Sequence, residues 1–282
     1  MVMAGNTVSI LEAVVLGFVQ GASEFLPISS TAHLRVVPAF LHWPDPGVAY
    51  SAVIQLGSVI AVLTYFFKDL LGIASGALKA LQEKNYDSKD LRMLGAILVG
   101  TLPICVLGLA LKPILESDSS PLRSLPVIGG ASIFMGLLLL LAEKFAKRSR
   151  SIDDVSGKDG FLVGLGQAMA LIPGCSRSGS TLTMALFLNY KRDEAARFSF
   201  LLGIPAIVLS GLLELKDMVK QGLSGDGMSS LIVGLLVSTI VSYAAIWWML
   251  KFLGTHSTWV FVVYRLIFGA AIIALSMSGM IQ

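Results

Sequence analysis

The sequence contains few of the residues from which metal centres, disulfide frameworks and charged surfaces are built. Its 282 residues include two cysteines and three histidines, and only 14% of all residues are charged. With so few ligands, neither a disulfide framework nor a zinc centre of several histidines is expected. The phosphate loop of nucleotide hydrolases, Gly-x-x-x-x-Gly-Lys-Ser/Thr, is also absent, which excludes that class of enzyme.

Two common phosphatase signatures are missing as well. Cys175 has no arginine six positions later, as the loop of the cysteine phosphatases requires. Ser176-Arg177 is not followed by the histidine of the lipid phosphatases that use a histidine nucleophile. We also expect no removable signal peptide, because the first residues do not combine a basic region, an apolar stretch and a small-residue cleavage site.

Apolar residues dominate the chain instead. They make up 55% of it, against about 45–50% in soluble domains. A bilayer crossing takes roughly 20 apolar residues. Uncharged runs of about this length lie at 48–67, 93–111, 124–142 and 228–250. A shorter run at 198–213 contains Pro205, and 257–282 contains Arg265. The sequence therefore predicts an all-α polytopic membrane protein with about six transmembrane helices.

Four further apolar pieces are too short to span a bilayer. Segments 13–23 and 25–34 flank Glu24, whereas 161–172 and 182–190 flank a Ser-Arg-Ser motif. Broken helices at membrane depth are tolerated only where they are buried in protein or line a cavity. We interpret each pair as a re-entrant helical hairpin, and a pair of amphipathic helices at the membrane surface is the alternative.

The two hairpins share a pattern. Each has a glycine, a glutamine three residues later and a serine nine residues after the glutamine, at Gly17, Gln20 and Ser29 and again at 164, 167 and 176. Each half of the chain then comprises one hairpin and three spans, and an odd number of spans inverts the second copy. We predict one membrane domain over 1–282, built from inverted repeats at about 1–150 and 151–282 with a site at their interface.

Charge asymmetry between loops predicts the topology. Most lysines and arginines fall in loops on one side, whereas Arg35, Arg177 and Arg265 are assigned to membrane segments. The loops on the other side contain Lys112, Arg123, Lys216 and Lys220. The positive-inside rule makes the richer side cytoplasmic and puts both termini outside. The hairpins then enter from opposite faces, and their tips can meet.

The first motif combines a carboxylate with hydroxyl groups and an imidazole. Gln20 and Glu24 lie four residues apart, on one face of a helix. Glu24 is a candidate general base or cation ligand, and Gln20 offers only an amide oxygen; a polar pair that stabilises a helix contact is the alternative. An ionisable residue inside a membrane indicates function by default.

Hydroxyl residues follow Pro27 at an expected helix start, where proline ends one helix and serine or threonine caps the next. A helix N-terminus also binds anions. His33 lies four residues after Ser29 and three after Ser30, so it can face either hydroxyl as a general acid or base. The alternative is an ordinary polar core histidine.

The second motif, 174–179, resembles a cradle for an oxyanion. Its glycines let the backbone approach closely, its hydroxyls donate, and Arg177 can bind phosphoryl oxygens in a bidentate fork. An arginine that reaches the lipid headgroups is the alternative. Arg265 either pairs with Glu143 or Glu214 or makes a second phosphate contact, and it is left outside the site.

These residues match a known pattern. Gln20-x-x-x-Glu24 running into Pro27-x-Ser-Ser-Thr-x-His33, followed by Pro173-Gly-x-Ser-Arg-Ser-Gly-x-Thr181, resembles the bacterial undecaprenyl-diphosphate phosphatase family, also called the bacitracin-resistance protein family. The resemblance extends over essentially the whole chain. It implies an inner-membrane enzyme that hydrolyses a long-chain polyprenyl diphosphate to the monophosphate and inorganic phosphate, at a site open to the outer face and assisted by a divalent cation, Mg²⁺ or Ca²⁺.

The resemblance and the motif chemistry together give the expected site. The catalytic residues are Glu24, Ser30, His33 and Arg177. The phosphate-binding residues are Ser29, Thr31, Ser176, Ser178, Gly179 and Thr181. The cation ligands are Gln20 and Glu24; the family also has glutamate at the first of these positions, and a glutamine cannot act as a base.

Ser30 is the expected nucleophile, activated by Glu24 or His33, and direct attack by water is the alternative. An inverted-repeat transporter of a small anion, or a flippase of the lipid carrier, is the alternative function. The Ser/His/Glu cluster favours catalysis, because anion binding alone does not need it. No nucleic-acid partner is expected, and the oligomeric state is left open.

Overall fold

In the computed structural model, residues 8–115, 120–221 and 225–281 are described. Over these ranges the chain forms helices and no named strand, apart from one isolated bridge between Arg150 and Tyr190. The helices of the first half are α1 (Ile10–Glu24), α2 (Ser30–Phe40), α3 (Gly47–Tyr65), α4 (Phe67–Gln82), α5 (Lys89–Leu115), η1 (Pro121–Arg123) and α6 (Leu125–Phe145). Those of the second half are η2 (Ile152–Asp154), α7 (Gly157–Ala168), η3 (Met169–Leu171), α8 (Arg177–Phe187), α9 (Arg192–Gln221), α10 (Gly225–Thr255) and α11 (Trp259–Met277).

Five helices in the described ranges are long and apolar enough to cross a membrane, namely α5, α6, α9, α10 and α11. α3 and α4 together pass the same test of length and composition, and they count as a sixth crossing if this pair, bent by 68°, is one broken span. The protein is thus an all-α multi-pass membrane protein, and the prediction of about six spans is confirmed. Pro205 lies inside α9 without ending it.

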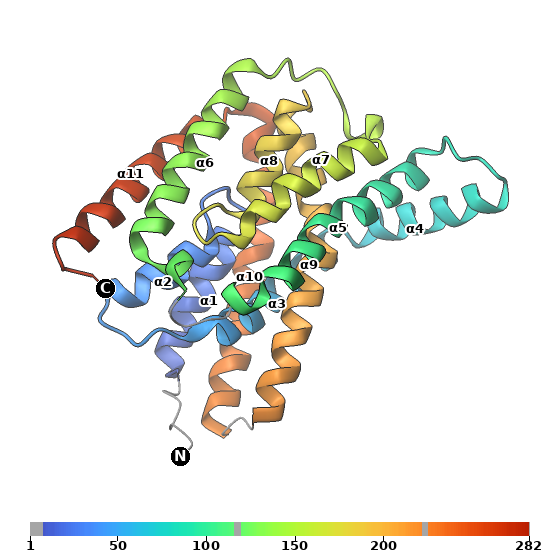
Figure 1. The fold of residues 1–282 in the computed structure, drawn as a ribbon. Helices are drawn as coiled ribbons and strands as arrows, with labels where there is room; N and C mark the ends of the chain where they lie inside the picture. The colour runs from blue at the N-terminus through green and yellow to red at the C-terminus, as the bar shows by residue number, and fades with distance from the viewer. Residues whose placement is uncertain (1–7, 116–119, 222–224, 282) are drawn as a thin grey trace.

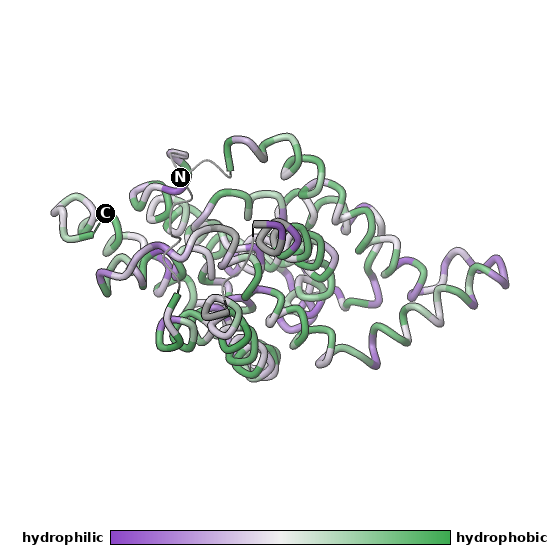
Figure 2. The backbone as a smooth tube through the Cα atoms, turned by 90° about the horizontal axis from the view of Figure 1, so that it is seen from below, coloured by the Kyte–Doolittle hydropathy of each residue, from purple (hydrophilic) through white to green (hydrophobic). Residues whose placement is uncertain are grey.

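One segment differs from its sequence interpretation. The distribution of charge predicts a loop over 68–92, whereas the chain bends at Phe66 and continues as α4. Together with the start of α5, α4 forms an arm that projects from the helix bundle (Figure 1). Figure 2 shows that hydrophilic residues gather at the turn between these two helices. Helical spacing of apolar residues between the lysines was the available signal.

Both predicted hairpins are present as broken helix pairs. The first is α1 and α2, separated at 25–29, and the second is α7 with η3 and α8, separated at 172–176. Ser29 and Ser176 cap the outgoing helices: their side chains accept from the backbone N–H of Ala32 at 3.3 Å and of Gly179 at 3.1 Å. Both capping serines have positive φ, 75° and 69°. The cap predicted after Pro27 is therefore confirmed, and Ser176 forms a second cap that the sequence analysis did not predict; both have an unusual backbone conformation.

Small residues allow the first helix of each hairpin to pack closely against a span of the other half. A Cβ on Gly17 of α1 would lie 2.6 Å from the carbonyl oxygen of Gly234 in α10. A Cβ on Gly164 of α7 would lie 2.3 Å from that of Gly100 in α5. Such contacts are typical of membrane helix packing. Both halves thus have a hairpin followed by three spans, and the inversion of the second half stays a prediction.

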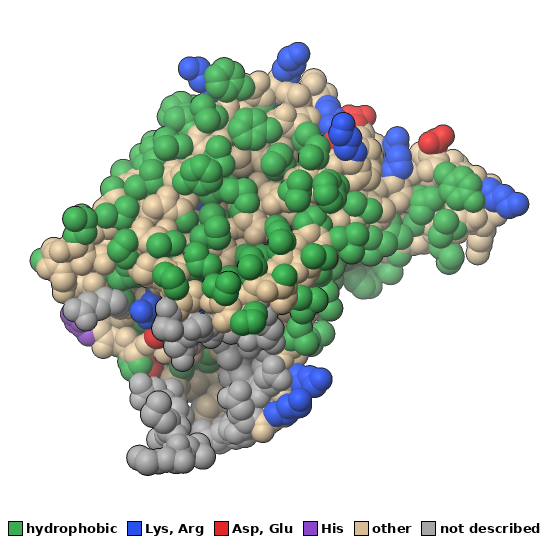
Figure 3. All heavy atoms as spheres, viewed as in Figure 1, with side chains coloured by type: hydrophobic (Ala, Val, Ile, Leu, Met, Phe, Trp, Pro, Cys, Tyr) green, Lys and Arg blue, Asp and Glu red, His purple; other side chains and the backbone are tan. Residues whose placement is uncertain are grey.

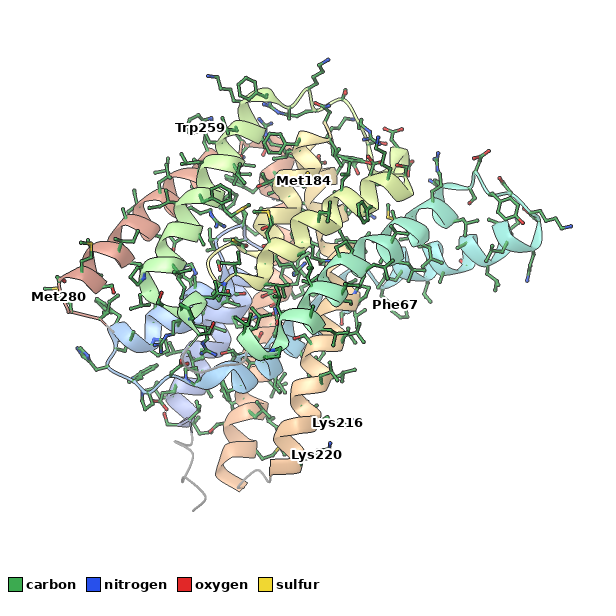
Figure 4. All side chains as sticks on the ribbon, in the orientation of Figure 1. Phe67, Met184, Lys216, Lys220, Trp259 and Met280 are labelled. Atoms are coloured by element: carbon green, nitrogen blue, oxygen red, sulfur yellow. The ribbon has the colours of Figure 1, made fainter. Side chains whose placement is uncertain are left out.

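The exposed surface of the helix bundle in the view of Figure 3 is apolar over its middle. Figure 3 shows hydrophobic side chains spread across this face, with lysines and arginines gathered towards its edges. In Figure 4, Lys216 and Lys220 lie at the lower end of the bundle, and Trp259 lies near the upper end. Single leucines and isoleucines such as Leu109 and Ile240 are 70% and 71% exposed. This is the surface of a protein whose surrounding solvent is lipid.

Candidate active site

The tips of the two hairpins touch inside the bundle. The hydroxyl of Ser178, in the second hairpin, donates to the backbone oxygen of Leu26 in the first at 2.9 Å. Arg177 forms an ion pair with Glu24, with Nη2 and Oε1 3.0 Å apart. Both side chains are almost fully buried, at 8% and 2% exposed. The structure therefore brings the two sequence motifs, more than a hundred residues apart, into one polar site.

Glu24 is the centre of this site, because its two carboxylate oxygens accept four hydrogen bonds. Oε2 accepts from the Ser30 hydroxyl at 2.7 Å and from Nε2 of Gln20 at 2.9 Å. Oε1 accepts from Nε2 of Gln55 at 3.0 Å and from Arg177 at 3.0 Å. Charge-assisted hydrogen bonds of this kind fix a buried carboxylate firmly. Glu24 is thus held in place by three helices and a hairpin tip.

Ser30 lies at the first position of α2, directly after the capping serine. Its hydroxyl donates to Glu24 across a distance that suits proton transfer to a general base. A serine oxygen paired with a base is the arrangement of an activated nucleophile. The structure therefore brings together two of the predicted catalytic residues, Ser30 and Glu24, with a third, Arg177, on the other oxygen of the carboxylate.

Arg177 retains hydrogen-bonding capacity. Its Nη1 donates to the backbone oxygen of Ser199 in α9 at 3.4 Å, and its Nη2 is used by Glu24. Its Nε is buried and has no partner among the described residues. A buried donor without a partner is costly. The guanidinium thus keeps one N–H that no described residue uses.

The other polar residues of the second motif hold the hairpin tip in shape. The hydroxyl of Thr181 donates to the backbone oxygen of Arg177 at 2.7 Å and lies 2.5 Å from the hydroxyl of Ser199. Ser176 caps α8, and its hydroxyl lies 3.3 Å from that of Ser178. A Cβ on Gly179 would lie 3.1 Å from the Cβ of Ser176, so the turn is tightly packed there.

The hydroxyls of the first motif are arranged in a similar way. Ser29, which caps α2, has its hydroxyl 3.1 Å from the hydroxyl of Thr31. Thr31 lines a cavity together with Gln20 and Gln55. These positions are compatible with the predicted contacts of Ser29 and Thr31 to phosphate, which stay a prediction.

His33 has other partners than either hydroxyl of the motif. Its Nδ1 lies 2.7 Å from the backbone oxygen of Ser29, and its Nε2 lies 2.6 Å from the hydroxyl of Tyr264 in α11. The ring also stacks on Phe268, with centroids 4.3 Å apart. A carbonyl only accepts, so Nδ1 carries the proton and Nε2 accepts from Tyr264. His33 thus connects α11 to the capped turn, and its role as a base stays a prediction.

Several residues of the site were missed by sequence reasoning. Gln55, in α3, donates to Glu24. Ser58, on the same helix, accepts from Nε2 of Gln20 at 3.3 Å and from the hydroxyl of Ser242 at 2.8 Å. The signal for Gln55 was present, because it is an amide inside an otherwise apolar predicted span. Ser58 and Ser242 carried no signal, since single serines are common in membrane helices.

Arg265 does not pair with Glu143, one of the two carboxylates that the sequence suggested for it. Its guanidinium, only 1% exposed, donates to the backbone oxygens of both hairpin tips. The distances are 2.8 Å to Pro27 and 2.6 Å to Gly174. Glu143 is instead bound by Arg192 and by the hydroxyl of Thr258. The side chain of Glu214 lies outside the described residues. Arg265 therefore ties the two tips together.

A cavity of about 250 Å³ adjoins the site. Its buried end is lined by Gln20 and Gln55, which bind Glu24, and its open end by Arg35, Asp45 and Arg123. Its walls include apolar side chains such as those of Leu34, Leu115, Leu122, Ile128 and Leu171. Most ligand cavities combine apolar walls with a few polar groups in this way. The chain thus offers a ligand a polar end and an apolar surface.

The donor set limits how a cation can bind. No group of three or more His, Cys, Asp or Glu side chains that could hold a metal occurs in the described ranges. Glu24 is the carboxylate of this site. In this structure Gln20 presents its amide N–H₂, and not its amide oxygen, to Glu24. Mg²⁺ is often held by one or two carboxylates together with substrate phosphates and water. The residues fit a cation shared with a phosphate ligand, and do not fit one held by protein alone.

Comparison with known proteins identifies the family of this chain. Residues 13–271 match the family model described as bacitracin resistance protein BacA. The chain belongs to the bacitracin resistance protein family. It is 57% identical to the undecaprenyl-diphosphatase of Gloeobacter violaceus over 97% of this chain and 94% of the relative. It is also 52% identical to that of Synechococcus elongatus, over 100% of this chain and 98% of the relative.

A third member of the family, from Trichormus variabilis, carries the same name. It is 55% identical over 97% of this chain and 86% of the relative. The match to the family model includes both hairpins, from α1 through α8, and extends into α11. The residues around Glu24 and Arg177 therefore lie within the part of the chain that defines the family.

Proposed function

We propose that this protein is an undecaprenyl-diphosphatase, which hydrolyses undecaprenyl diphosphate to undecaprenyl phosphate and inorganic phosphate. The observation that carries the proposal is the contact of Ser30 and Arg177 with the two oxygens of Glu24. The names of close relatives support it. An anion transporter or flippase is less favoured, because transport alone does not require a serine paired with a base.

The chemistry follows from this geometry. Ser30 Oγ bonds to the terminal phosphorus as its proton passes to Glu24, and the bond from that phosphorus to the bridging oxygen breaks. Undecaprenyl phosphate leaves, and water then hydrolyses the phosphoserine ester to inorganic phosphate and free Ser30. Arg177 stabilises the charge on the transferred phosphoryl group through its free N–H. Attack by water with Glu24 as base gives the same products.

A divalent cation, Mg²⁺ or Ca²⁺, is part of the proposal. Glu24 would hold it, and Gln20 would join after its amide turns to present Oε1. Bound there, the cation would neutralise charge on the diphosphate. The chain's own residues orient the substrate. Arg177 and the hydroxyls of Ser29, Thr31 and Ser176 bind the phosphoryl group, and Ser178 joins them once its hydroxyl leaves the backbone oxygen of Leu26. The apolar walls of the cavity, which Thr31 also lines, receive the polyprenyl chain.

We place the enzyme in the bacterial inner membrane, with the cavity open to the outer face. The unequal distribution of lysine and arginine between the two sets of loops supports this orientation. In this position the reaction recycles the lipid carrier for cell-wall synthesis and gives resistance to bacitracin. A C-terminal reporter that is active only in the cytoplasm stays inactive if the orientation is right, whereas an active reporter contradicts it.

The function is tested with purified protein in detergent, by measuring phosphate released from undecaprenyl diphosphate. We expect release that depends on a divalent cation and is lost in Glu24→Gln, which keeps the size of the side chain. Gln82→Glu, at the end of the projecting arm, is the control for a change between amide and carboxylate. Release that is unaffected by Glu24→Gln contradicts the assigned site.

A further inference from the structure

A cluster of three charged residues stands at the open end of the cavity. Oδ2 of Asp45 accepts from Nη1 of Arg35 at 2.8 Å and from Nη2 of Arg123 at 3.1 Å. Its other oxygen, Oδ1, accepts from the backbone N–H of Gly47 at 3.0 Å. Arg35 comes from α2, Asp45 from the connection to α3 and Arg123 from η1, so three separate segments converge here. Arg35, which the sequence suggested was within a membrane segment, thus pairs with a loop residue.

The cluster has a surplus of positive charge and of donors. Two guanidinium groups share one carboxylate, and a second carboxylate on them is not found in the described part of the chain. Nε of Arg35 and Nη1 of Arg123 are buried and have no hydrogen-bond partner there. A buried donor that lacks a partner is destabilising until an acceptor reaches it. Among the described residues, the carboxylate of Asp45 therefore neutralises only one of the two positive charges and leaves these two N–H donors without an acceptor.

The position of the cluster relates it to the reacting groups. Arg35, Asp45 and Arg123 line the same cavity as Gln20 and Gln55, both of which bind Glu24. The side chains of Arg35 and Arg123 are 31% and 19% exposed, so they are accessible to a ligand and yet partly shielded from water. Partial shielding strengthens their attraction for an anion. A purely structural ion pair would need only one of the two arginines.

We propose that Arg35 and Arg123 form a second phosphate-binding site at the mouth of the cavity, separate from Arg177. The ligand is a phosphate group, either the inorganic phosphate that leaves or the phosphate that remains on the lipid. Arginine suits either source, because its fork matches phosphate oxygens. Asp45 holds the two arginines in place when the site is empty and competes with the anion for them. The proposal rests on the proposed function for the origin of its ligand.

The first experiment measures equilibrium binding of radiolabelled inorganic phosphate to the purified protein without substrate. Arg35→Gln and Arg123→Gln should each weaken binding about tenfold or more, since each removes a charge-assisted contact. Lys220→Gln, an exposed charge at the end of α9, is the matched control and should leave binding unchanged. Equal binding in wild type and both arginine variants overturns the proposal.

Asp45→Asn should change the affinity for phosphate in the opposite direction. Asparagine keeps an oxygen for the N–H of Gly47 but removes the competing charge, so phosphate should bind more tightly, by about tenfold. Damage to the fold would weaken binding instead, and therefore cannot imitate this result. Weaker or unchanged binding in a folded Asp45→Asn protein overturns the proposal.

Two further measurements, inhibition of turnover by inorganic phosphate and binding of undecaprenyl phosphate, distinguish the two sources of the phosphate. If the site holds the released product, inorganic phosphate inhibits turnover in wild type, and Arg35→Gln relieves that inhibition. If it holds the lipid phosphate, Arg35→Gln weakens binding of undecaprenyl phosphate and leaves inhibition by inorganic phosphate unchanged. Either result supports the site, and the absence of both contradicts it. Phosphate binding without any hydrolysis of undecaprenyl diphosphate would refute the proposed function and leave the site standing.

Discussion

The guanidinium of Arg177 packs closely against α9 because position 203 is glycine. A Cβ built on Gly203 would be 1.8 Å from Nη1 of Arg177 and 2.5 Å from its Cζ. No side chain fits in that space unless the guanidinium moves. This close packing sets the position of the guanidinium relative to α9. It thereby also sets the distance of 3.0 Å between Nη2 of Arg177 and Oε1 of Glu24.

Gly203→Ala should therefore displace Arg177 and lower kcat about a hundredfold, comparable to the loss of one donor that stabilises transition-state charge. The fold should survive, because alanine is a better helix former than glycine. The matched control is Gly95→Ala in α5, where an added Cβ meets nothing within 4 Å. Similar phosphate-release rates in the two variants would show that the position of Arg177 does not limit the reaction.

Ser30→Ala should reduce phosphate release by several orders of magnitude if Ser30 is the nucleophile, because the step that transfers phosphoryl to protein is removed. Ser29→Ala is the neighbouring control. It loses a helix cap and one hydrogen bond, worth roughly 1–3 kcal/mol or about tenfold to a hundredfold. If Ser30→Ala retains a tenth of the rate while His33→Ala is inactive, the serine only binds substrate and His33 or water performs the attack.

The Gln20→Glu variant should remain active and should reach half-maximal activity at a lower concentration of the divalent cation. Nε2 of Gln20 lies 2.9 Å from an oxygen of Glu24, so the substitution puts two carboxylates side by side. A cation between them relieves their repulsion and gains a ligand. The measurement is the rate as a function of Mg²⁺ concentration, with half-maximal activity expected at a lower concentration than in wild type. Complete inactivation at saturating Mg²⁺ in folded protein would contradict the predicted cation ligands.

Asp159→Asn should lower the melting temperature at pH 7 by about 5 °C. Burial by itself would raise the pKa of Asp159, but hydrogen bonds from Arg150 and Ser156 outweigh it, and the pKa lies below its ordinary value. Both nitrogens of the Arg150 fork donate to Asp159, each at 2.8 Å. A carboxyl whose pKa is lowered on folding adds stability above its ordinary pKa, and this contribution disappears as the pH falls through the lowered value.

The pH dependence separates this effect from simple loss of packing. The difference in melting temperature between wild type and Asp159→Asn should be largest at pH 7 and should shrink below about pH 4. Asp193→Asn, in the first turn of α9, is the control for loss of an acidic group at a helix start. A difference that stays constant down to pH 3 would mean that the charge of Asp159 does not contribute.

Much of the site was predictable because it lies in short continuous motifs. Local steric and hydrogen-bonding rules place Pro27 and Ser29 at a break and a cap, and the cost of a carboxylate in lipid indicates that Glu24 has a function. Gly203 and Tyr264 were not predictable. They act on Arg177 and His33 from distant helices, and a glycine or a tyrosine in a membrane helix is common for other reasons.

The sequence by itself determined that this is a helical membrane protein with two broken hairpins, because hydrophobic length and helix-breaking residues are local properties. Only the tertiary structure decided which side chains face one another. In the folded chain Arg177 forms an ion pair with Glu24, and His33 forms a hydrogen bond with Tyr264. Arg265 donates to the backbone oxygens of both hairpin tips. The physical reason is that a buried charge takes the partners that packing brings within hydrogen-bonding distance, and this packing arises from segments far apart in the chain.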